Sequence, residues 1–280
     1  MLLFLPIAMA TSGCIKEDRS HCLPGTVCFT VKAYTEAQAE LTQAEVGDVL
    51  LYVFDGDFRF MELIETQLGT VVEVRPPASG GIHIVAWGNL KGGNQTLPLF
   101  LTNDHKQTGK VSLLPDSRAA APHHSPNDLF LGEITTTKEQ HNSNVVIPMF
   151  RKTGSMTVTV RKLKEYAGFA DNNFSVVIRE TSNTFDFYGN CTGAKATYRP
   201  NATFSGETFN VPVFNIIPET GLTIDLYHGN DLVYSASSSG GQPIDVTQGK
   251  LTNVLIDFTG SINVSVQETP WGQKYVWKEY

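Results

Sequence analysis

Short runs of alternating apolar and polar residues recur along the chain. In the first of them, Val27, Phe29 and Val31 fall on one face of an extended segment. Successive side chains of a β-strand point to opposite faces of its sheet, so such runs predict half-buried strands. The pattern occurs in residues 27–34, 156–161, 174–179 and 222–227. Repeated short strands with turn residues between them are typical of β-sandwiches.

Other segments refine this picture. Val49–Phe54 is a continuous apolar run, which predicts a strand covered on both faces. Glu36–Glu45 has the composition of a short helix, but its apolar residues form no continuous stripe. We therefore expect a nearly all-β protein.

The length of 280 residues indicates about two domains, at ~150 residues each. Residues 102–128 are polar and rich in proline, and we expect them to form a long excursion inside the first domain. Val145–Pro148 reads as the end of one sandwich, and Arg151–Gly154 as the start of the next. The predicted organisation is residues 1–13 as signal peptide, 14–25 as lipidated cysteine and tether, 26–150 as the N-terminal domain, and 151–280 as the C-terminal domain.

Composition narrows the class of protein. Hydrophobic residues make up 41% and charged residues 18% of the chain, which is enough apolar material for a sizeable core. The formal net charge of −7 provides no field that attracts phosphate backbones, so we expect no nucleic-acid partner.

The N-terminus predicts a lipid anchor. Met1–Ala10 is apolar but far shorter than the ~20 residues that span a bilayer, as in a signal peptide. The small residues Thr11–Gly13 before Cys14 resemble a bacterial lipoprotein cleavage box, in which the cysteine sulfur takes a diacylglycerol. The alternative is an ordinary secretory signal with an incidental cysteine. Two or three acyl chains hold a protein stably, because each buried methylene contributes ~0.8 kcal/mol.

Charged residues directly after this cysteine predict the membrane to which the lipoprotein is exported. Lys16, Glu17 and Asp18 resemble the export signal that sends Bacteroidetes lipoproteins to the outer leaflet of the outer membrane. The remaining cysteines leave two pairings open, because Cys28 or Cys22 could each bond the other or bond Cys191. A disulfide within the first pair requires a turn between its members.

Candidate chemistry is sparse. His123 and His124 are adjacent, so on an extended segment they point to opposite sides, and no further ligand stands at metal-binding spacing. Ser237–Gly241 lacks the pattern of a nucleophile elbow, and no phosphate loop or dinucleotide fingerprint occurs. We expect no enzyme, cofactor, metal or small-molecule substrate. Core packing explains the tryptophans better than a sugar-stacking platform does; these are Trp87, Trp271 and Trp277.

Six features follow one another along the chain: Cys14–Asp18 with Cys22, Leu51–Asp55 with Gly56 and Phe58, Val85–Leu90, Asp128–Gly132, Arg151 and Trp271. In order and spacing they resemble the anchor-subunit family of Bacteroidales type V fimbriae, the FimB-type minor fimbrial subunits. The resemblance implies two transthyretin-like β-sandwich domains, lipidation at Cys14, and a non-catalytic role at the base of a fimbrium.

The resemblance also implies a mode of assembly. Fimbrial subunits of this system join by strand exchange, in which main-chain hydrogen bonds and alternating side chains supply the affinity. Only a short tail, Tyr275–Tyr280, ends the chain a few residues after Trp271, so we expect this subunit to accept a strand from a shaft subunit without donating one.

Two functional hypotheses result. The first is a surface lipoprotein that anchors a fimbrium to the outer membrane and limits its length, and an unfilled apolar groove along a sandwich would favour it. The second is a surface glycan-binding lipoprotein of a polysaccharide-uptake system. A coplanar row of exposed rings that included Trp271 or Trp277 would favour the second.

Overall fold

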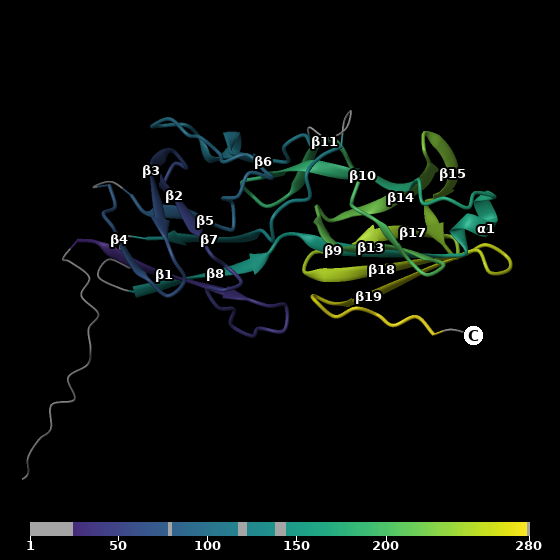
Figure 1. Cartoon of the computed structure of the whole chain (residues 1–280). Coiled ribbons are helices and arrows are strands. Elements are labelled where there is room, and N and C mark those ends of the chain that lie inside the picture. The colour runs from purple at the N-terminus through teal and green to yellow at the C-terminus, as the bar shows by residue number, and fades with distance from the viewer. Residues whose placement is uncertain (1–24, 78–79, 117–121, 138–143, 279–280) are drawn as a thin grey trace, which may run out of the picture.

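The computed structural model describes residues 25–77, 80–116, 122–137 and 144–278. Within these ranges the chain is almost entirely β-structure, as the alternating patterns predict. Figure 1 shows the strands in two halves that lie end to end, with β1 to β5, β7 and β8 in one half and β9 onward in the other. The helical elements of the described ranges are the 3-10 helix Lys106–Thr108 and α1 (Leu163–Ala167).

The first half contains a seven-stranded sheet. Its strands lie in the order β3 (Phe60–Thr66), β2 (Val49–Asp55), β5 (Ile82–Gly88), β7 (Phe130–Thr136), β8 (Asn144–Arg151), β1 (Val27–Tyr34) and β4 (Val71–Val74). Strand β1 runs parallel to β8 and antiparallel to β4, and the other neighbours in this first sheet are antiparallel.

This first sheet curls around its own core. Phe29 of β1 and Leu51 of β2 belong to one buried cluster, although the two strands are not neighbours in the sheet. The alternate residues of β2, including Tyr52, belong to a second cluster on the opposite face. Strand β2 is therefore covered on both faces, as its unbroken apolar run predicts. In β7, a Cβ on Gly132 would lie 2.2 Å from the carbonyl oxygen of Pro148, so only glycine fits there.

The second half contains two sheets. The second sheet has the order β11 (Cys191–Tyr198), β10 (Phe174–Asp186), β14 (Glu219–His228), β17 (Gln242–Val246) and β16 (Ser238–Ser239), with β15 (Asp231–Ala236) paired to β14. The third sheet has the order β12 (Thr203–Ser205), β13 (Thr208–Ile216), β9 (Gly154–Arg161), β18 (Lys250–Asp257) and β19 (Asn263–Pro270).

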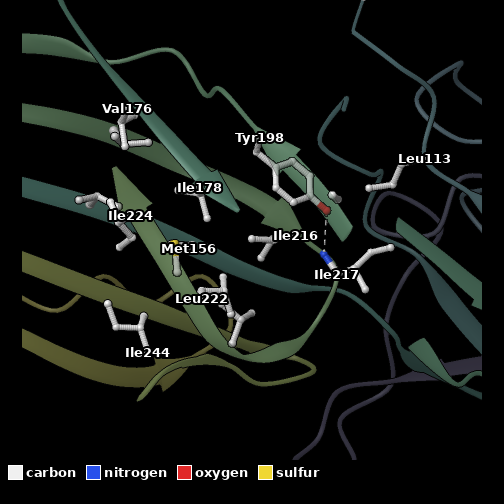
Figure 2. Packing of buried hydrophobic residues seen from close by; sticks show 14 of the residues in the cluster. Leu113, Met156, Val176, Ile178, Tyr198, Ile216, Ile217, Leu222, Ile224 and Ile244 are labelled. Atoms are coloured by element: carbon white, nitrogen blue, oxygen red, sulfur yellow. Dashed lines mark hydrogen bonds between the residues drawn. The ribbon is translucent and has the colours of Figure 1, made fainter. Parts of the chain in front are cut away.

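These two sheets pack face to face as a sandwich. Figure 2 shows Ile178 and Ile224 of the second sheet close to Met156 of the third, and all three are fully buried. At one end, the backbone N–H of Ile217 donates to the hydroxyl of buried Tyr198 at 3.4 Å. The prediction of β-sandwich architecture is confirmed.

One strand joins the two halves. Strand β6 (Lys110–Ser112) lies in the proline-rich excursion, yet it pairs with the end of β10, where Val111 stands opposite Phe185. In Figure 1, β6 lies beside β10 above the boundary between the halves. The expectation that this excursion stays inside the first domain is wrong, because its middle extends the second sheet.

The short helix that the composition of Glu36–Glu45 would allow does not form. Gln38 has a φ of 63°, in the left-handed region, and the N–H of Leu41 donates across to the carbonyl of Ala33 at 2.8 Å. These contacts form a turn that returns the chain beside the end of β1. No helix in the described ranges has the length and apolar character needed to cross a bilayer.

Candidate interaction site

The predicted lipid site lies outside the described residues. Cys14 and the export-signal residues Lys16, Glu17 and Asp18 precede residue 25, where the description begins. The structure does show where this tether enters the fold, because β1 starts at Val27. Strand β1 is hydrogen-bonded on both sides, by β8 and β4, and its first residues are fully buried. A force on the tether therefore acts on a strand paired along both edges.

The structure shows the bonding state of two of the cysteines. Cys28 in β1 is disulfide-bonded, whereas Cys191 at the start of β11 is a free thiol. The alternative pairing through Cys191 is therefore excluded. Desolvation raises the pKa of the Cys191 thiol to about 11, so it is protonated at neutral pH and is a poor nucleophile.

Residues from three of the resembling segments meet at the junction between the halves. The guanidinium of Arg151 donates to both carboxylate oxygens of Asp128, at 2.6 and 2.8 Å. It also lies over the ring of Trp271, 4.1 Å from the centroid, and over Phe130 at 4.8 Å. Bidentate pairing and stacking are specific to arginine. This cluster, which we call the junction clasp, joins the end of β8 to the segment after β19.

A fourth resembling segment supports the same junction. Asn89 follows β5 with a φ of 59°, and its amide donates to the carbonyls of Glu45 and Asp128, both at 2.9 Å. Asn127 in turn donates to the carbonyl of Asn89 at 2.9 Å. These side chains satisfy backbone groups that no strand reaches, so the role of these residues is structural.

An aromatic cluster continues the core from one half into the other. Phe187, just after β10, contacts Tyr52 and Phe100 with ring centroids 4.9 and 5.0 Å apart. It also lies 6.3 Å from Phe54 and 6.2 Å from Trp87. One buried cluster thus includes residues of the first sheet and of the sandwich.

A charged cluster joins two buried side chains, Lys106 and His83, to the exposed Glu133. The ammonium of Lys106 donates to Glu133 at 2.5 Å and lies 4.2 Å from the ring centroid of Tyr188. His83 in β5 bonds Thr135 through Nδ1 at 2.8 Å, and its Nε2 lies 3.6 Å from Glu133. Desolvation, helped by the nearby lysine, lowers the pKa of His83 to about 4. No pattern in the sequence indicates that this lysine is buried.

The tryptophans do not form a sugar-binding row. Trp87 is fully buried, as predicted, but core packing is the wrong expectation for Trp271 and Trp277, which are half-buried at the surface. Trp271 is stacked with Arg151, and Trp277 meets Tyr275 at an interplanar angle of 66°. A flat sugar platform needs coplanar exposed rings, and these rings do not provide one.

A cleft of 620 Å³ opens at the junction clasp. Its lining mixes Trp271 and Leu41 with the charged side chains of Glu36, Lys250 and Glu268. It is therefore not the apolar groove along a sandwich that we expected to favour a fimbrial protein.

The two adjacent histidines do not form a metal site. His123 is held by backbone pairing with Thr197 of β11, and His124 lies 4.0 Å from Asp116. No group of three or more potential ligands occurs within the ranges that the structure describes.

The outermost strands of the sheets are protected against pairing with other chains. Charged residues or short length discourage addition to an exposed edge. Glu62 and Glu73 lie on the ends of the first sheet, Lys195 on β11 and Glu268 on β19, whereas β12 and β16 have three residues or fewer. An uncharged extended segment with unpaired backbone groups would therefore differ from these protected edges.

The fold and these contacts define a class of protein: an all-β protein whose sheets share a continuous core, with no group of three or more potential metal ligands among the described residues. The family model for fimbrillin-A associated anchor proteins Mfa1 and Mfa2 matches residues 19–277, and the chain belongs to this family. The resemblance seen in the sequence is thereby confirmed.

Individual relatives agree with this assignment. The major fimbrium anchoring subunit FimB of Porphyromonas gingivalis is 26% identical, with 100% of this chain and 97% of the relative covered. A second FimB sequence from that species is 27% identical over the same shares. These relatives are structural anchoring proteins, in agreement with the expectation of no enzyme.

Solved structures show the same fold. The fimbrial anchor protein Mfa2 of Porphyromonas gingivalis matches with a TM-score of 0.66 at 16% identity, covering 89% of this chain and 98% of that one. A candidate polysaccharide-binding protein of Bacteroides thetaiotaomicron matches with a TM-score of 0.66 at 15% identity, with the same shares covered.

Proposed function

We propose that this chain is an anchoring subunit that holds a fimbrium at the bacterial surface. The observation that carries the proposal is the family match over residues 19–277, together with FimB relatives aligned along the whole chain. The fold supports it, because the tether leads into β1, and β1 is paired on both sides within a sheet whose core is continuous with the aromatic cluster.

The proposed attachment is covalent lipidation of Cys14 in the outer membrane, with Lys16, Glu17 and Asp18 directing the chain to the outer leaflet. This arrangement leaves Cys22 as the proposed disulfide partner of Cys28, because Cys191 is a free thiol and Cys14 carries the lipid. Mass spectrometry of unreduced peptides should find Cys22 joined to Cys28. A bond from Cys28 to Cys14 would refute lipidation.

The decisive experiment compares Cys14→Ala with wild type in the native bacterium. We expect labelled palmitate to disappear from the variant chain and its fimbriae to move from the cells to the medium. Cys191→Ala is the matched control, since it removes a thiol without touching the tether, and it should keep both the label and the cell-bound fimbriae. Unchanged labelling and unchanged attachment in Cys14→Ala would reject the anchoring proposal.

The export signal is tested separately. Replacing Lys16, Glu17 and Asp18 by alanine should preserve palmitate labelling but hide the chain from protease added outside the cells. Continued digestion of this variant on intact cells would show that these residues do not direct export.

The proposed assembly is strand complementation with a shaft subunit. The chain's own tail supports the role of acceptor, because it is bound to the third sheet. The N–H of Tyr275 donates to Asn253 Oδ1 at 3.0 Å, and Arg161 donates to the carbonyl of Lys278 at 3.4 Å. A tail held in this way is not available as a donor strand.

A further inference from the structure

An exposed row of leucines crosses the outside of the first sheet. Leu97, Leu99 and Leu101 have exposed fractions of 46, 92 and 77%, whereas the intervening Pro98 is buried and Phe100 is half-buried. This alternation means that the segment is extended, with one side on the protein and the other in solvent. We call these three side chains the leucine ridge. The sequence of this segment, Leu-Pro-Leu-Phe-Leu, shows the alternation, although no functional prediction included it.

The segment is held firmly from below. The ring of Phe100 lies 5.7 Å from Tyr52, 5.3 Å from Phe54 and 5.2 Å from Phe60, centroid to centroid. The hydroxyl of Tyr52 also donates to the carbonyl of Pro98 at 3.2 Å. The leucines are therefore presented on a fixed backbone, which reduces the entropy lost on binding.

Both ends of the segment are fixed as well. The N–H of Thr96 donates to the carbonyl of Ser112 in β6 at 2.8 Å, so the chain before the ridge pairs with the second sheet. At the other end, the N–H of Leu101 donates to Asp104 Oδ2 at 2.7 Å. The ridge thus continues a paired stretch into a region where no strand lies beside it.

Part of the backbone of this segment is unpaired, although the carbonyl of Pro98 and both backbone groups of Leu101 have partners. Leu97, Leu99 and Phe100 make no hydrogen bond through their N–H or carbonyl groups to any part of the chain that the structure describes. From Gly92 to Asn103 the sequence carries no charged residue, in contrast to the protected terminal strands of the sheets. An extended, uncharged segment with free backbone groups is the usual template for an added strand.

We propose that the segment Leu97–Leu101 is where this protein receives an extended strand of a fimbrial shaft subunit. The strand carries apolar residues at alternate positions, which lie beside the leucine ridge on the same face, and its backbone pairs with the free N–H and carbonyl groups. An extended occupant follows from the period of two in the leucines, because a helix would match neither this spacing nor the open backbone. This inference rests on the proposed function and specifies its binding site.

The experiment uses the variant Leu99→Asp/Leu101→Asp, with Leu232→Asp as matched control. Leu232 in β15 is 55% exposed and lies far along the chain from the ridge. In the native bacterium, the ridge variant should keep its palmitate label yet release its fimbriae, whereas the control should retain them. With purified proteins, we expect at least tenfold weaker binding of the shaft subunit, because the added carboxylates would be desolvated in the complex.

Hydrogen exchange adds a direct readout. Binding of the shaft subunit to wild type should slow exchange of the Leu97 and Leu99 amides, because these alternate N–H groups point to the same side of the extended segment and become donors in the new pairing. Unchanged thermal melting of the ridge variant would show that it is folded, as expected for substitutions at exposed positions.

Several results would overturn the proposal. Retained fimbriae in the ridge variant, or unchanged exchange at these amides, would place the binding site elsewhere. A wild-type dimer that becomes a monomer in the ridge variant, with fimbriae retained, would show that a second copy of this chain occupies the ridge. The proposed function fails separately, through unchanged attachment in Cys14→Ala.

Discussion

At the scale of single residues, the structure separates side chains that hold the fold from those that face a partner. Asp128, Arg151 and Trp271 appeared in the sequence as marks of a family, and their contacts show that they form the junction clasp. Leu99, which carried no such mark, is the most exposed of the large apolar residues that the structure describes. The residues that carry the family resemblance can therefore serve to stabilise the fold, while the proposed partner-binding surface is made of other residues.

The junction clasp predicts a strong effect of removing its carboxylate. Asp128→Ala leaves the guanidinium of Arg151, which is only 7% exposed, without its bidentate acceptor. We expect a loss of about 3 kcal/mol in the free energy of unfolding, typical of an uncompensated buried charge. Urea denaturation measures it. Lys32→Ala breaks an exposed pair with Glu40 and serves as control, with little change expected. Equal effects of the two variants would contradict the structural role.

His83 predicts the pH dependence of stability. Its pKa is about 4 in the folded protein, below the ordinary histidine value of 6.5, so the unfolded chain binds the extra proton between these values. Stability from this group is complete above pH 6.5 and is lost as the pH falls towards 4, by about 3 kcal/mol. His83→Gln should flatten unfolding free energy against pH in this window. An unchanged slope would show that other groups control the acid response.

At the scale of elements, the strands with regular alternation were predictable and the interrupted ones were not. Strand β1 occupies the residues 27–34 that the sequence indicates. The second part of β10 was missed, because register shifts after Arg179 and Ser182 break the period of two, and Glu180 has a φ of 81°. Bulges of this kind hide a strand from pattern analysis.

The connection between β6 and β10 was equally hidden. Strand β6 has only three residues, too few for a period to emerge, and its partner lies more than seventy residues along the chain, as the pairing of Ser112 with Thr184 shows. The junction clasp was equally hard to predict from the sequence, because no local pattern indicates that Asp128 and Trp271 lie close together. Composition and pattern indicate the type of element, and long-range packing decides which elements meet.

The aromatic cluster predicts that both halves unfold together. Phe187→Ala removes a buried ring that follows β10 of the second sheet and contacts Tyr52 and Phe100 of the first half, and we expect a loss of about 3–5 kcal/mol in the free energy of unfolding. Circular dichroism and the fluorescence of buried Trp87 should change in a single transition at a lower denaturant concentration. Leu232→Ala, at an exposed position, should cause little change. Two separated transitions in wild type would show that the halves are independent.

At the scale of the whole molecule, strand β1 and the leucine ridge lie on opposite sides of the first half. Strand β1 packs on one face of β2 through the core that contains Phe29 and Leu51. The opposite face of β2 carries Tyr52, which contacts Phe100 directly beneath the ridge. Figure 1 agrees, with β1 low in the view and the segment between β5 and β6 high. A fimbrium bound at the ridge would thus point away from the membrane.

The proposed strand acceptance also bears on fimbrial length, which the sequence leads us to expect this subunit to limit. The ridge would accept a strand, whereas Tyr275 and Lys278 of the tail are hydrogen-bonded to Asn253 and Arg161 on the third sheet. If the tail stays bound there, each binding event ends one fimbrium, and the mean length depends on the ratio of shaft subunits to anchors.

Electron microscopy tests this consequence with variants that separate binding from attachment. Lower production of the anchor should give longer fimbriae. Cys14→Ala should shed fimbriae of normal length, because termination needs strand acceptance and not the lipid. Leu99→Asp/Leu101→Asp should shed fimbriae that are longer than normal, because the ridge no longer accepts a strand. If both variants released fimbriae of the same length, termination would depend on something other than the ridge, and length control would have to be separated from anchoring.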